Sequence, residues 1–195
     1  MQNTKKISTQ TVVLGAVLTA LVIILQYLGA FIKFGPFSIS LVLIPIVIGA
    51  ATCGKYIAAW LGLVFGFAVL MSGDAGAFLA VNPLGTVVTV LLKGTLCGLA
   101  SGAIYGLLSG KNSYLAVAVS AVLCPIVNTG VFLIGCQLFF MPTIVGWALS
   151  EGFGANAWQY IIVGMVGINF LVELAINIIL CPIIVRLLNV RQKQM

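Results

Sequence analysis

Charged residues are scarce in this chain. Of its 195 residues only 6% are charged, nine of them Lys or Arg and three Asp or Glu. An ordinary soluble domain carries about 25% charged residues, so a surface built from so few charges excludes a soluble enzyme or a DNA-binding domain. With 62% hydrophobic residues and a mean hydropathy of +1.26, the composition is typical of a polytopic membrane protein.

Histidine is absent altogether. Its absence excludes Ser–His and Cys–His catalysis, HExxH zinc chemistry and histidine-ligated haem. The five cysteines form no CxxC pair, and most stand in apolar runs, so we interpret them as buried free thiols. The sequence contains no pair of carboxylates that would indicate acid–base chemistry. We therefore expect neither an enzyme nor a metal or cofactor site.

Six apolar runs predict six membrane spans, at about 11–32, 38–53, 56–71, 84–108, 114–140 and 157–188. Roughly 20 helical residues cross a bilayer, so the second and third runs are barely long enough and the sixth has residues to spare. The first run is too long for a signal-peptide core and lacks a cleavage pattern. No linker interrupts the pattern. We therefore expect an all-α membrane protein, a compact bundle of six transmembrane helices that forms one domain over residues 1–195.

The distribution of basic residues predicts the orientation of this bundle. Six spans place both termini on one side, which would hold Lys5, Lys6, Lys55, Lys111, Arg186, Arg191 and Lys193. The other side would hold Lys33, Asp74 and Glu151. The positive-inside rule then makes both termini cytoplasmic, in a cell membrane. The two longer outer connections, about 72–82 and 141–156, either fold back over the bundle or form solvated loops.

Polar residues inside the spans are the candidate binding residues, because they are costly there and usually face a cavity or the bundle interior. Lys93 lies in the fourth span, Asn128 in the fifth, and Asn169, Glu173 and Asn177 in the sixth. Helical rise places Lys93, Asn128 and Asn169 at similar depths in the outer half. They either form a solute site, or Lys93 pairs with Glu173 across a depth difference of ~11 Å. Asn177 lies deeper, and we interpret it as a contact between helices.

Two further patterns mark the fourth span. Asn82 and Pro83 stand at its outer start, where a helix N-terminus either reinforces an anion site at Lys93 or merely begins the helix. Small residues recur at every fourth position, which predicts close packing against a neighbouring helix. These residues are Gly94, Gly98, Gly102 and Gly106.

Several motifs together resemble one transporter family over essentially the whole chain. They are Ala16-x-x-x-Ala20, the stretch Ile39-Ser-Leu-Val-Leu-Ile-Pro-Ile-Val-Ile-Gly-Ala50, Ser72-Gly-Asp-Ala-Gly-Ala-Phe78, Asn82-Pro-Leu-Gly-Thr86, Leu92-Lys-Gly-Thr95 and Pro125-Ile-Val-Asn-Thr-Gly130. With the size and the six spans, they resemble the substrate-binding S components of energy-coupling-factor (ECF) vitamin transporters.

The resemblance implies a vitamin-binding subunit in a prokaryotic plasma membrane. Such a subunit docks on a transmembrane coupling subunit that two cytosolic ATPases drive, and this chain has no GxxxxGK[ST] loop of its own. By the same resemblance, Ala16 and Ala20 contact the coupling subunit. The pocket is expected near the outer face, gated by the loops after the first and third spans.

The sequences of the outer loop and the fourth span most resemble those of pantothenate-type members. Lys93 would then bind the carboxylate, and Asn128 and Asn169 the hydroxyls and amide, with Glu173 and Asn82 as further candidate binding residues. A hydroxymethylpyrimidine-type substrate is the alternative, with Glu173 and the asparagines as ligands and a structural role for Lys93. A stand-alone secondary transporter is the alternative from another class, but the inverted repeats and broken helices typical of that class are not found in the sequence.

Overall fold

A computed structural model of the chain describes residues 9–31, 33–34, 37–38 and 40–192. The architecture is helical, with one hairpin of two-residue strands, which confirms the expected all-α class. The elements are α1 (Thr9–Gly29), β1 (Lys33–Phe34), β2 (Phe37–Ser38), α2 (Leu43–Cys53), α3 (Lys55–Met71), α4 (Gly76–Val81), α5 (Pro83–Leu108), α6 (Ser113–Gly135), the π-helix η1 (Cys136–Phe140), α7 (Met141–Ser150), α8 (Ala157–Gln159), the π-helix η2 (Tyr160–Val166) and α9 (Gly167–Gln192).

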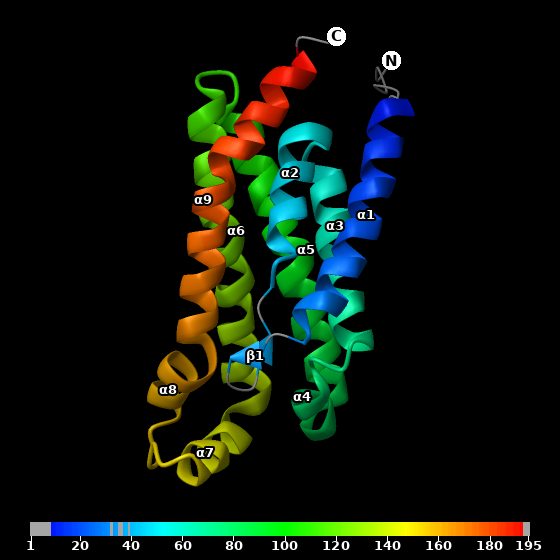
Figure 1. Cartoon of the computed structure of the whole chain (residues 1–195). Helices are drawn as coiled ribbons and strands as arrows, with labels where there is room; N and C mark the ends of the chain where they lie inside the picture. Colours follow the sequence, from blue (N-terminus) through cyan, green and yellow to red (C-terminus); the bar gives the residue numbers. More distant parts are fainter. Residues whose placement is uncertain (1–8, 32, 35–36, 39, 193–195) are drawn as a thin grey trace, which may run out of the picture.

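The long helices run along a common axis, and the three short helices α4, α7 and α8 gather at one end of the bundle (Figure 1). We call this the covered end; α1 begins and α9 ends at the opposite one (Figure 1). Phe78 of α4 packs in one apolar cluster with Phe140, Ile144 and Ile161. Both longer connections therefore fold back over the bundle, as one of the two sequence interpretations predicted.

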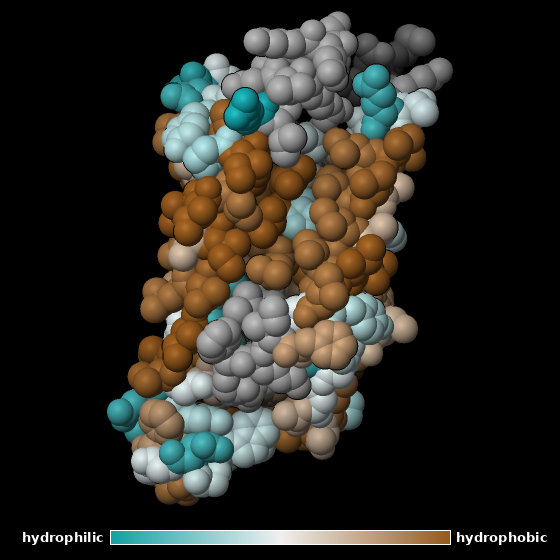
Figure 2. Space-filling view, in the orientation of Figure 1, coloured by the Kyte–Doolittle hydropathy of each residue, from teal (hydrophilic) through white to brown (hydrophobic). Residues whose placement is uncertain are grey.

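Four helical segments are long and apolar enough to cross a membrane: Thr9–Gly29, Pro83–Leu108, Ser113–Ser150 and Ala157–Arg186. Figure 2 shows hydrophobic residues over the middle of one face and hydrophilic residues toward both ends, as expected for a multi-pass membrane protein. The shorter α2 and α3 have 11 and 17 residues, or about 16 and 25 Å. Hydrocarbon about 30 Å thick exceeds both lengths, so only four of the six predicted spans are long enough to cross alone.

The second span was predicted to begin at residue 38, and this boundary is wrong. Ser38 instead pairs with Lys33 in the antiparallel β1–β2 hairpin, and α2 begins at Leu43. The predicted end of the first span at residue 32 and the motif residue Ile39 lie outside the described residues, as do Lys5, Lys6 and Lys193 of the charge count.

Local sequence signals set the helix ends that shape the bundle. Pro83 opens α5, and the Asn82 side chain caps it by accepting a hydrogen bond from the Gly85 amide at 2.9 Å. Asn112 caps α6 in the same way. Gly54 joins α2 to α3 with a φ of 88°, a conformation that favours glycine, so the two helices meet without a loop.

The small residues of α5 pack directly against α3. A Cβ atom at Gly94 would overlap the Gly62 backbone, and one at Gly98 would overlap the Ala58 backbone. This confirms that the stripe serves packing inside the bundle, although Gly106 at its end faces open space. The close seam between α3 and α5 fixes the helix that carries Lys93.

Candidate binding pocket

A pocket lies among α5, α6 and the η2–α9 segment, and it brings together most of the predicted polar residues. Lys93 of α5, Asn128 of α6, and Asn169 and Glu173 of α9 all line it. Asn82 does not, because its side chain is engaged in capping α5. The structure thus brings four of the five predicted residues together in one place. These four span 81 positions of the sequence, from Lys93 to Glu173.

The Lys93 ammonium lies between two aromatic rings. Its Nζ atom is 5.3 Å from the centroid of the Phe65 ring and 5.7 Å from that of Phe132. Both distances suit cation–π attraction, which holds the charge without neutralising it. In the described part of the chain no salt bridge joins Lys93 to Glu173, so the pairing that the sequence left open is not present. The positive charge therefore faces the pocket.

Glu173 supplies a carboxylate on the α9 wall. Only 5% of this residue is exposed, and its Oε1 atom accepts a hydrogen bond from the Ser40 backbone amide at 3.0 Å. Ser40 stands between the hairpin and α2, so this bond holds the segment that follows α1 against the pocket. A carboxylate accepts several hydrogen bonds, which leaves Glu173 able to accept from a ligand as well.

Asn128 carries a polar atom that the protein leaves unused. The residue is 5% exposed, and within the described ranges its Oδ1 atom has no hydrogen-bond partner. A buried acceptor without a partner costs stability, and native proteins contain few of them. A ligand donor in the pocket would satisfy this atom.

Asn177 is buried in the bundle, and its predicted role as a contact between helices stays a prediction. Its Nδ2 atom donates to the Glu173 carbonyl of its own helix at 2.8 Å, and its Oδ1 has no partner among the described residues.

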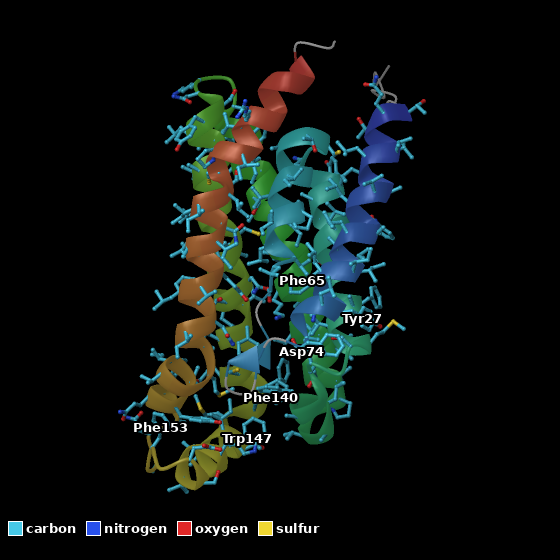
Figure 3. The ribbon with its side chains drawn as sticks, in the orientation of Figure 1. Tyr27, Phe65, Asp74, Phe140, Trp147 and Phe153 are labelled. Atoms are coloured by element: carbon cyan, nitrogen blue, oxygen red, sulfur yellow. The ribbon has the colours of Figure 1, made fainter. Side chains whose placement is uncertain are left out.

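The pocket also contains Asp74, which the sequence analysis did not select. Asp74 lies in the turn between α3 and α4 and lines the pocket; Figure 3 labels its position in the bundle. A single acidic residue in a glycine-rich, apolar connection was the available signal. The turn and the segment at Ser40 therefore both contribute to the lining of the pocket.

The pocket is small in this form. Its free volume is about 60 Å³, which holds a few water molecules, whereas pockets for small molecules usually measure roughly 300–1,000 Å³. Binding of a larger solute requires the surrounding segments to move apart.

Ala16 and Ala20 lie away from this pocket. Both are exposed, one helical turn apart on α1. The same helix exposes Val12, Val13 and Val17 but buries Gly15 and Leu18, so its small-residue face is directed away from the core.

Comparison with known proteins gives one match. The model of the family described as "ECF transporter, substrate-specific component" matches residues 10–185. No curated protein and no solved structure matches the chain.

Proposed function

Because the chain belongs to the substrate-specific components of ECF transporters, we propose that it captures a vitamin, with pantothenate as the best candidate. Family membership makes it a substrate-specific membrane subunit of such a transporter. The proposal adds the identity of the substrate, the residues that bind it and the way it is delivered.

The observation that carries the proposal is the Lys93 ammonium, which faces the pocket and forms no salt bridge with a carboxylate among the described residues. The carboxylate of pantothenate would accept a hydrogen bond from Lys93 and form an ion pair with it. Its two hydroxyls and its amide would meet Asn128, Asn169 and Glu173, whose side chains offer acceptors on the facing helices.

Delivery follows from the exposed face of α1. We propose that Ala16 and Ala20 contact the coupling subunit, because small side chains let two helices approach closely. The coupling subunit would work with two cytosolic ATPases, and the chain would act as one domain with both termini cytoplasmic in a prokaryotic plasma membrane. Release would then depend on the assembled complex.

A hydroxymethylpyrimidine is the second candidate, and the acidic residues favour it. Asp74 and Glu173 both line the pocket, and carboxylates suit the amino group and ring nitrogens of a protonated aminopyrimidine. In that case Lys93 would serve the bundle through its two aromatic contacts.

The test begins with mass spectrometry of the small molecule that co-purifies with the chain. Calorimetry would then compare the wild type with Lys93→Met and with Lys111→Met, a control that removes an exposed lysine. We expect Lys93→Met to weaken pantothenate binding by at least ~1.5 kcal/mol, or more than about tenfold, because a charge-assisted hydrogen bond is lost.

Unchanged pantothenate affinity in Lys93→Met would remove this lysine from the site. Tight binding of the pyrimidine, equal in both variants, would favour the second candidate. Vitamin uptake into liposomes by the purified chain alone would instead indicate a secondary transporter.

A further inference from the structure

A smaller chamber adjoins the pocket on the side of the covered end. Asp74, Lys93 and Phe132 line both spaces, so Lys93 stands at their junction. Beyond Lys93 the walls of the small chamber are largely apolar, with Phe78 and Phe140 among them. Its free volume is about 30 Å³, which suits one small chemical group and not a whole solute.

Thr89 lines this chamber, and its hydroxyl forms no hydrogen bond with the described residues. The residue is 4% exposed, and within the described residues its Oγ1 atom has no hydrogen-bond partner. Threonine in a helix normally donates to the carbonyl four residues earlier. Four other helical threonines do so at 2.7–2.8 Å, namely Thr19, Thr52, Thr86 and Thr95.

Two neighbours define the position of the Thr89 side chain. Gly135 lies against it so closely that a Cβ atom at that position would overlap both Cγ2 and Oγ1 of the threonine. Lys93 follows four residues later on α5, so both side chains project from the same face of the helix. Thr89 and Lys93 thus line one small chamber from the same face of α5.

From this geometry we propose that Thr89 is a second hydrogen-bond donor of an anion subsite, with the ligand carboxylate held between Thr89 Oγ1 and Lys93 Nζ. The inference rests on the proposed function, because it assumes a substrate with a carboxylate. The rest of the molecule would extend into the main pocket, toward Asn128 and Glu173. The Asp74 carboxylate also lines both chambers, and it would repel a bound anion. A hydrogen bond from Thr89, beside the Lys93 charge, would help to offset that repulsion.

The experiment compares two ligands and three variants by calorimetry. The ligands are pantothenate and pantothenol, in which a hydroxymethyl group replaces the carboxylate. The variants are Thr89→Val, Thr89→Ser and the control Thr95→Val, which changes a threonine of the same helix that already donates to its own backbone. We expect Thr89→Val to weaken pantothenate binding about tenfold and pantothenol binding less than about twofold, because only the carboxylate gains a charge-assisted bond.

Further outcomes separate this inference from its alternatives. Thr89→Ser and Thr95→Val should keep the wild-type affinity, and ligand-free Thr89→Val should melt no earlier than the wild type, since it loses an unsatisfied polar atom. Pantothenate affinity unchanged in Thr89→Val, or an equal loss for both ligands, would overturn the anion subsite alone. A wild type that does not bind pantothenate would overturn the proposed function and this inference with it.

Discussion

The seam between α3 and α5 provides the sharpest test of the packing. At Gly98 an added Cβ atom would meet the carbonyl oxygen and carbon of Ala58 and the amide nitrogen of Ala59. All three are backbone atoms, so no side-chain rotation relieves the overlap, and the two helices must move apart. At Gly106, on the same helix, an added Cβ atom meets nothing within 4 Å.

We therefore expect Gly98→Ala and Gly106→Ala to differ in stability. Each variant gains up to about 1 kcal/mol of helix propensity, which cancels in the comparison. The remaining difference is the steric cost at Gly98, about 1–3 kcal/mol for overpacking and more if the backbone resists. Parting the helices by about 1 Å would forfeit roughly a quarter to a half of the dispersion energy of the affected contacts.

The assay is equilibrium unfolding in mixed micelles with increasing SDS, followed by circular dichroism. Gly98→Ala should unfold at a lower SDS fraction than both the wild type and Gly106→Ala. If Gly98→Ala were as stable as Gly106→Ala, the backbone contact between α3 and α5 would be refuted.

Two other predictions concern docking and binding. The double variant Ala16→Leu/Ala20→Leu should still bind solute but should no longer co-purify with the coupling subunit. The control Ala103→Leu, which changes another exposed alanine, should co-purify normally. A normal yield of the complex from the double variant would refute docking through α1. Asn128→Leu should raise the unfolding free energy of the ligand-free protein by about 1 kcal/mol and weaken solute binding, as thermal melts and calorimetry would detect; unchanged binding would show that its unpartnered oxygen serves no ligand.

The pocket was largely predictable because ionisable and amide side chains are expensive inside a membrane. This single argument selected Lys93, Asn128, Asn169 and Glu173, and the structure brings all four to one cavity. Asn82 was instead selected because a helix N-terminus favours anions, and in the structure a helix cap already explains its side chain.

Other features depend on distances that a sequence does not contain. Thr89 looks like any helical threonine until the structure shows that its hydroxyl does not bond to the preceding turn. Asp74 lies outside the spans, so an argument about polar residues within helices passes over it. The late start of α2 follows from pairing across a hairpin, whereas the apolar run continues through it without a break.

The lengths of the helices also bear on the surrounding lipid. Tyr56, Trp60, Phe67 and Met71 expose their side chains along α3, which is only about 25 Å long, whereas α5 measures about 39 Å. The hydrophobic height of the chain therefore varies around its perimeter. A bilayer relieves such mismatch by thinning locally or by letting the protein tilt, at fractions of a kcal/mol per Å. Acyl-chain length in the host membrane thus becomes a variable that changes the energy of hydrophobic mismatch around this subunit.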